Sequence, residues 1–239
     1  VDQIACQTCH IPEMARGGKP TKVWWDWSTA GQKNADGTAI VTKDDNGWTT
    51  YDTKKGDFIW EDNLEPVYVW YNGKSDFTVV GEEIDDSDVY VINAPQGSSE
   101  DGRIWPMKLF QGNQPYDPVN KVLAIPHLFG KDEAAYWKSY DWNTAIAAGM
   151  EDAGVPYSGE YDFTETDMYW PTTHMVAPAT DALECVECHS EDGRLADIEG
   201  VNMPAASKMP VADTLGMLML GLAVMGVVVH GGMRVAKKK

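Results

Sequence analysis

Cysteine occurs in this chain only within two copies of one short pattern, Cys-x-x-Cys-His. Residues at i and i+3 of a helical turn share a face, so two thiols with this spacing can bond to the edge of one porphyrin. The histidine that follows can then place an imidazole nitrogen on the iron. The pattern is the attachment signature of a c-type haem, and each copy therefore predicts one covalently bound haem. The predicted haem residues are Cys6, Cys9 and His10 in the first copy and Cys185, Cys188 and His189 in the second.

Zinc binding and disulfide formation are the two alternative uses of these cysteines. Cys-x-x-Cys pairs occur in zinc ribbons, but here they begin at positions 6 and 185, far outside ribbon spacing. A disulfide framework fits an oxidising compartment, yet it gives neither histidine a role. The repeated histidine and the lack of any other cysteine favour two covalent haems.

The charge balance of the chain is strongly acidic, with 37 acidic against 19 basic residues and a net charge of −18. This charge argues against nucleic acid as a partner, because phosphate binding needs the opposite sign. The acidic surface can steer a basic protein partner or simply keep the protein soluble. No Ser-His-Asp or paired-carboxylate arrangement stands out, so no catalytic residue is predicted.

The C-terminal region contains twenty consecutive residues without a charge, 214–233, rich in Leu, Met, Val and Gly. A helix of this length spans roughly 30 Å, the thickness of the hydrocarbon layer of a bilayer. Arg234 and three lysines follow, and the positive-inside rule places this basic tail in the cytoplasm. The alternative is a buried core helix. We predict a transmembrane helix at 213–235 and a cytoplasmic tail at 236–239.

The remainder of the chain is predicted to lie outside the cytoplasm, as a dihaem cytochrome c domain at 1–195 followed by a linker at 196–212. No signal peptide precedes the first motif, which begins five residues after Val1. The sequence is therefore expected to be a processed form or, as we favour, a piece of a longer chain.

Turn and strand signals are concentrated in the first half of the chain. Asn72-Gly73 between the apolar runs 67–71 and 77–80 predicts a β-hairpin, with further short strands at 58–60 and 89–92. Residues 31–56 and 93–126 are rich in turn-forming residues and are predicted to be mostly irregular.

Helical signals are strongest in the second half. Residues 132–140 and 144–152 are predicted helices, the second ended by Gly154, and Thr180 is predicted to cap a helix that leads into the second motif. The expected fold class is a multihaem cytochrome c: loop-rich, mainly α with a small β-hairpin insertion, plus one C-terminal transmembrane helix. Covalent haems would replace much of an ordinary hydrophobic core.

The sixth ligand of each iron needs a further side chain, because a low-spin electron-transfer haem has His or Met on both faces. Two histidines outside the motifs lie before the apolar segment, His127 and His174, and both are predicted axial ligands. His230 lies within the apolar segment, close enough to its end to reach the interface. The sequence does not show which haem each histidine serves. Weaker candidates are Met14, Met175, Met203 and Met209.

Several segments of the chain together carry a family resemblance: residues 6–12, 21–22, 25–31, 106–108, 114–117, 174–178, 182–183 and 185–189. On these segments, and over about residues 4–195, the chain resembles the C-terminal part of the octahaem c-type cytochromes of the tetrathionate reductase family. The resemblance implies closely packed haems with mostly bis-His ligation and a periplasmic location. It also implies that His174 is a distal axial ligand and that His127 is a further candidate for this role. That family carries eight haem motifs, and this sequence has two and no Cys-x-x-Cys-Lys.

Two functions follow as hypotheses. The first is a membrane-anchored multihaem cytochrome that transfers electrons on the outer face of the membrane, within a larger multihaem assembly. The second is the C-terminal part of an octahaem reductase of sulfur or nitrogen oxyanions, such as tetrathionate, nitrite or hydroxylamine. The expected partners are the membrane, a quinone-reactive membrane protein, and other multihaem cytochrome segments or subunits, whose haems His127 and His174 can also serve.

Overall fold

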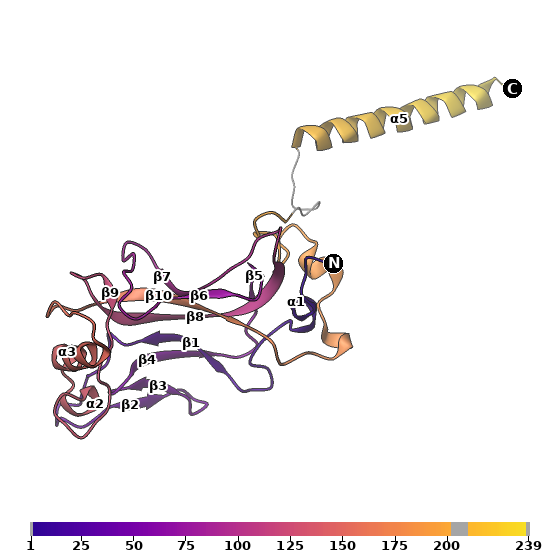
Figure 1. Ribbon diagram of the computed structural model, residues 1–239. Coiled ribbons are helices and arrows are strands. Elements are labelled where there is room, and N and C mark those ends of the chain that lie inside the picture. Colours follow the sequence, from indigo (N-terminus) through magenta and orange to yellow (C-terminus); the bar gives the residue numbers. More distant parts are fainter. Residues whose placement is uncertain (1, 202–209, 238–239) are drawn as a thin grey trace. The chain divides into compact units, whose positions relative to one another are not determined.

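The computed structural model describes residues 2–201 and 210–237, and the chain forms two compact units, Val1–Leu183 and Glu184–Lys239. The first unit is built on a mixed ten-stranded β-sheet, with a helix α1 and two helices α2 and α3 (Figure 1). Its elements are α1 (Cys6–His10), β1 (Thr21–Asp26), β2 (Val41–Lys43), β3 (Thr49–Asp52), β4 (Gly56–Glu61), β5 (Val67–Tyr71), β6 (Ser75–Phe77), β7 (Tyr90–Pro95), β8 (Arg103–Asp117), β9 (Val122–Leu123), α2 (Tyr136–Ser139), α3 (Trp142–Ala153), β10 (Asp162–Pro171) and the 3₁₀ turn η1 (Ala179–Asp181).

The sheet overturns the predicted fold class, because the first unit is not mainly α. Its strands follow the order β2-β3-β4-β1-β8-β10-β7-β6, and β5 and β9 also pair with β8. The strand β8 has fifteen residues and lies within the stretch predicted to be irregular. Its prolines and its glycine suggested a loop, but β10 pairs with it antiparallel over ten residues, from Asp162 opposite Tyr116 to Pro171 opposite Met107. Tertiary pairing therefore overrides the local turn signals.

Gly112 shows why a turn-forming residue stands inside this strand. A Cβ atom at Gly112 would lie 2.6 Å from the carbonyl oxygen of Trp25 in the neighbouring strand β1. The backbone of β1 approaches β8 in parallel here, with Trp25 opposite Gly112. A residue with a side chain would block this close approach of the two backbones, so glycine is needed here. Glycine inside a strand often marks such a contact.

The predicted hairpin is also wrong, although its turn is present. Asn72 accepts a hydrogen bond from the Lys74 N–H through its side-chain oxygen, at 3.1 Å, as expected of a turn. The two flanking strands do not pair with each other, since β5 pairs with β8 and β6 pairs with β7. The predicted strands at 58–60 and 89–92 are confirmed within β4 and β7, while β2 and β3 occupy part of the stretch 31–56 that was predicted to be loop.

The helix α3 confirms the predicted helix at 144–152. Asp141 caps its start by accepting a hydrogen bond from the Thr144 N–H at 3.1 Å, and Gly154 ends it in the left-handed conformation, at a φ of 69°. The predicted helix at 132–140 shrinks to the four residues of α2. Thr180 lies in η1 and does not cap a helix, because its hydroxyl donates to Asp181.

An aromatic core fills the space between α2, α3 and the sheet, and it contains no predicted haem residue. Tyr136 and Trp142 stack with ring centroids 3.9 Å apart, and Trp27 stacks on Trp25 at 4.6 Å. At this end of the sheet the core is therefore an ordinary one, contrary to the expectation that haems replace it. Its buried members are Trp27, Val122, Tyr136, Trp142, Ala145, Ile146 and Met150.

Replacement of Tyr136 by Phe is expected to stabilise the first unit. The Tyr136 hydroxyl is buried, and within residues 2–201 and 210–237 it has no hydrogen-bond partner, so removing it relieves an unsatisfied polar group and raises the free energy of unfolding by about 1 kcal/mol. Burial also raises the pKa of Tyr136. Wild-type stability is therefore full below the ordinary tyrosine pKa of 10.0 and falls as pH rises above it, because the unfolded state ionises first.

Denaturant titrations at pH 7 and pH 11 check this expectation, and the advantage of the Phe variant over wild type should widen at pH 11. Tyr161→Phe, at a position 38% exposed, is the control and should leave stability within about 0.5 kcal/mol of wild type. A destabilised Tyr136→Phe variant would show that the hydroxyl is satisfied.

The second unit contains two helices, α4 (Cys185–Cys188) and α5 (Pro210–Ala236). Over residues 211–236, α5 is long and apolar enough to cross a membrane, with a mean hydropathy of 2.0, and none of the described residues in the window that defines this span is buried. The predicted linker 196–212 lies partly outside the described residues, as do Met203, Met209 and the last two residues of the predicted basic tail.

Candidate haem sites

The first motif forms α1, whose inner face is fixed to the beginning of β8. Thr8 is fully buried, and its hydroxyl donates a hydrogen bond of 2.7 Å to the carbonyl oxygen of Ile104. The Ala5 N–H donates to the same oxygen at 3.0 Å. These two bonds fix which face of the five-residue helix lies against the sheet.

The opposite side of α1 carries all three predicted haem residues. Cys6 and His10 are exposed and Cys9 is half-buried, whereas Thr8 between them is buried. Two thiols and an imidazole thus lie on the accessible side of a turn that is held from behind. This arrangement fits covalent attachment of one haem, which needs both sulfur atoms at the porphyrin edge and the imidazole toward its centre.

The segment that follows β10 closes over the C-terminal end of α1. The Ala177 N–H donates to the His10 carbonyl oxygen at 2.8 Å, and the Leu183 N–H donates to the Cys9 carbonyl oxygen at 2.9 Å. Carbonyl groups at a helix end need such partners. The same segment contains His174, so the structure brings this predicted ligand into the region of the first motif.

His174 lines a cavity of about 390 Å³ whose walls are mainly apolar. Met14, Trp170 and Met175 contribute to the walls, and two lysines, Lys19 and Lys108, also line the cavity. Apolar walls with a few convergent polar groups are typical of a cofactor site. The cavity therefore offers an imidazole, two thioethers and two ammonium groups to a mainly apolar occupant.

The backbone beside His174 is held in a strained conformation. Met175 has a φ of 71°, which is unusual for a residue other than glycine. Arg16 stabilises this conformation by donating a hydrogen bond of 2.6 Å from Nη2 to the Met175 carbonyl oxygen. Its buried Nε has no hydrogen-bond partner among residues 2–201 and 210–237. Strain of this kind is concentrated at functional sites.

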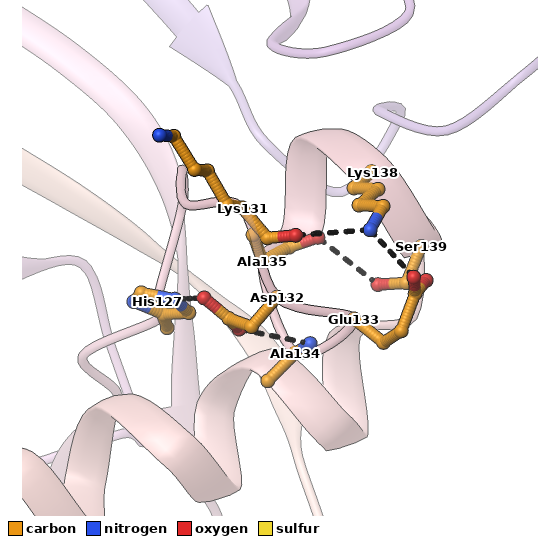
Figure 2. Close-up of polar contacts among 8 residues, drawn as sticks. All are labelled: His127, Lys131, Asp132, Glu133, Ala134, Ala135, Lys138 and Ser139. Carbon is orange, nitrogen blue, oxygen red and sulfur yellow. Dashed lines mark hydrogen bonds and ion pairs between the residues drawn. The ribbon is translucent and has the colours of Figure 1, made fainter.

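His127, the other predicted ligand, lies at the α2–α3 end of the sheet. Its Nε2 is 3.2 Å from Oδ2 of Asp132, a contact that lowers the pKa of Asp132 (Figure 2). Its backbone is also fixed, because its N–H donates to the Ala145 carbonyl oxygen and its own carbonyl oxygen accepts from the Tyr136 N–H, both at 2.9 Å. A histidine ring held by a carboxylate through one nitrogen keeps the other nitrogen for a ligand, which is a common arrangement at metal sites.

The length of β8 separates His127 from α1. At about 3.3 Å per residue, a fifteen-residue strand extends on the order of 45 Å. Ile104, near its first residue, contacts α1, whereas Tyr116 and Asp117 at its end pair with β9, shortly before His127. Figure 1 shows α1 and α2–α3 at opposite ends of the sheet. Both axial ligands of one iron must lie on opposite faces of the same porphyrin. Since His127 and α1 lie at different ends of the sheet, the structure does not bring His127 to the first motif.

The second motif forms α4, and its start is capped by its own flanking acids. Glu184 and Glu187 form a capping box, in which each side chain accepts a hydrogen bond from the backbone of the other. Cys185 and His189 are exposed, while Cys188 is buried. The Arg194 N–H donates to the Glu187 carbonyl oxygen at 2.9 Å and so holds the following loop against the helix.

Three residues that position these groups were not among the site residues predicted from the sequence: Thr8, Arg16 and Lys108. Thr8 and Arg16 act through partners about a hundred or more residues away, as their bonds to Ile104 and Met175 show. Local spacing carries no signal for such contacts. Lys108 stood in a segment that carried the family resemblance, and this was the available clue to it.

Two short helices that present Cys-x-x-Cys-His groups, one of them packed on a sheet, define the chain as a c-type cytochrome. The chain belongs to the bacterial cytochrome c family, because the family model described as "Cytochrome c bacterial" matches residues 22–192. A solved octahaem cytochrome c from Shewanella oneidensis is 38% identical in sequence, with a TM-score of 0.75. The match covers 86% of this chain and 48% of that one, so this chain spans about half the length of that relative. A comparison with curated proteins gave no match.

The family resolves the chemistry of the motifs in favour of haem c over zinc or a disulfide, and the four cysteines fit two attachment sites. The likeness to octahaem cytochromes c is confirmed. A closer relation to tetrathionate reductases is not shown by these matches.

Proposed function

We propose that the protein is a membrane-anchored multihaem c-type cytochrome that transfers electrons on the outer face of a membrane, within a larger multihaem assembly. The observation that carries this proposal is the presentation of Cys6, Cys9 and His10 on the accessible side of a helix fixed from behind, in a chain that shares its fold with an octahaem cytochrome c. Haem supplies one-electron redox chemistry when it is bound.

The chain's own residues hold and orient two haems in this proposal. Cys6 and Cys9 attach one porphyrin and His10 ligates its iron, and Cys185, Cys188 and His189 do the same for the second. His174 is proposed as a distal axial ligand, because it lines an apolar cavity in the unit that carries the first motif. Apolar walls exclude water from an iron and so tune its reduction potential.

His127 supports the multihaem part of the proposal. Its backbone and one ring nitrogen are fixed by Ala145, Tyr136 and Asp132, yet it lies near the end of the sheet that is remote from α1 (Figure 1). A histidine that is fixed in this way is suited to ligate the iron of a haem held by another cytochrome segment or subunit. Such a partner is also consistent with the coverage of 48% of the solved octahaem chain.

The family and α5 both support the proposed location. Bacterial cytochromes c are typically exported, and α5 has the length and composition of a membrane span. With the basic residues after it on the cytoplasmic side, the haem-bearing part would lie outside, next to a quinone-reactive membrane protein as its electron partner.

Replacement of His174 by Ala is expected to convert one ferric haem of this chain from low spin to high spin, because the iron loses its sixth ligand. Electron paramagnetic resonance and visible spectra of the oxidised protein measure the change. His127→Ala is the matched control, since His127 is remote from α1, and its spectra should equal those of wild type in the chain alone. If His127→Ala produced the high-spin species and His174→Ala did not, the ligand assignment would be reversed.

The alternative function is the C-terminal part of an octahaem reductase of sulfur or nitrogen oxyanions. The favouring observation is the octahaem relative of about twice the length, which leaves room for a catalytic haem on another segment. Addition of nitrite or sulfite to the oxidised chain discriminates between the two functions. A spectral change at a haem of this chain would indicate an open iron and count against a pure carrier.

A further inference from the structure

Lys108 stands on β8 opposite Trp170 of β10, at the wall of the His174 cavity. Its Nζ donates a hydrogen bond of 2.5 Å to the hydroxyl of Thr21 and lies 5.5 Å from the centroid of the Phe110 ring. Both neighbours are uncharged. The ammonium group is therefore held in place by groups that orient it without neutralising it.

No carboxylate of the described residues forms an ion pair with Lys108, although acidic residues outnumber basic ones by 37 to 19. Lys121 and Lys138 do pair with acids, Asp86 at 2.7 Å and Glu133 at 2.5 Å respectively, on exposed surface. Burial alone lowers the pKa of Lys108, with no charged group to oppose it. A half-buried cation without a counter-charge is costly, so its retention at a cavity wall needs a reason.

We propose that Lys108 binds an anionic oxygen of the group that occupies the His174 cavity, and that this oxygen is in the first place a haem propionate. The inference deepens the proposed function, because it assumes that His174 faces a haem. A haem has an apolar body, an iron that takes an imidazole and a carboxylate edge. The cavity offers apolar walls, His174 and the Lys108 ammonium in that order.

The neighbouring lysines do not share this role. Lys22 is engaged by rings, with Nζ 3.6 Å from the Phe58 centroid and 4.5 Å from that of Trp25. Lys19 lines the same cavity but is exposed, so water screens its charge. Lys108 is thus the lysine of this cavity whose charge acts in partly desolvated surroundings, where an ion pair is strongest.

The expected effect is on a reduction potential. A positive charge close to a haem favours the reduced iron, because reduction adds negative charge, so removing it lowers the potential. Lys108→Met keeps the apolar stem and removes the charge. In the full haem-loaded chain, the reduction equilibrium of one haem is expected to shift about tenfold toward the oxidised form, which is about 59 mV for one electron.

Spectroelectrochemical titration measures this shift, with Lys19→Met as the matched control and Lys108→Arg as the conservative variant. Lys19→Met should leave both potentials as in wild type, and Lys108→Arg, which keeps the positive charge, should leave the potential close to that of wild type. Intact mass verifies that all variants carry the wild-type number of haems. A lowered potential without added anions identifies the propionate as the bound group.

A second arm identifies a free oxyanion as the source instead. If Lys108→Met leaves the potentials unchanged but abolishes a haem spectral response to nitrite or sulfite that wild type and Lys19→Met retain, the anion is a small oxyanion. If neither the potential nor the oxyanion response changes, the proposal is overturned. The proposed function is judged separately by the spin state of His174→Ala, which does not depend on Lys108.

Discussion

A chain in which Cys6 and Cys9 are both replaced by serine is expected to carry one covalent haem fewer than wild type. Serine oxygen does not form the thioether bonds that hold a c-type haem, and no other cysteine is available to compensate. The loss should be complete rather than partial, because attachment is covalent. Intact mass spectrometry measures it directly, and haem-peroxidase staining after denaturing electrophoresis provides a second readout.

The corresponding variant at Cys185 and Cys188 should lose the other haem, and the four-serine chain should carry none. Gln7→Ala and Val186→Ala change residues between the cysteines and serve as controls, because both should retain the wild-type mass of bound haem. A wild-type chain without two covalent haems, or a four-serine chain that retains one, would contradict the assignment of both motifs.

The motifs could be predicted because their information is local. Cys6, Cys9 and His10 lie within one helical turn, and their spacing alone specifies the chemistry. What holds that turn in place could not be predicted, since Thr8 bonds to Ile104 and His10 to Ala177, across much of the chain. Spacing within a motif identifies a ligand set, whereas orientation depends on contacts that no short window contains.

The sheet was missed for a related reason. β8 contains Pro106, Gly112 and Pro115, each a turn signal in isolation. Each has a partner elsewhere in the chain: Gly112 admits the Trp25 backbone, and the carbonyl oxygens of Pro106 and Pro115 accept hydrogen bonds from the N–H groups of Thr172 and Ala124. Pairing over ten residues with β10 outweighs these local preferences.

The axial ligands show the limit of counting. Two motifs and the two histidines that lie outside them and before the apolar segment balance numerically, but the sequence does not show which haem each histidine serves. The structure separates the two histidines instead, with His174 beside the α1 region and His127 bonded to Asp132 at the far end of β8. The number of candidate ligands does not say where each one lies in the fold. Their positions depend on the path of the strands.

Truncation of the chain after Val201 is expected to move the protein from the membrane fraction to the soluble fraction. The deletion removes α5, whose span 211–236 has a mean hydropathy of 2.0, and a helix of this length and composition suits the bilayer interior. The first unit is compact by itself and should keep its haem spectrum. Membrane fractionation with carbonate washing, followed by haem staining of both fractions, measures the redistribution.

A full-length variant, Leu220→Arg with Leu222→Arg, separates anchoring from the effect of shortening the chain. Each arginine near the middle of a spanning helix costs about 2.5–3.5 kcal/mol of insertion free energy, so two should release most of the protein. Lys237→Gln, which lies beyond the apolar span, is the control and should remain in the membrane fraction. If the truncated chain stayed there too, α5 would not be the anchor, and attachment to a membrane-bound partner through the haem-bearing unit would have to account for the location.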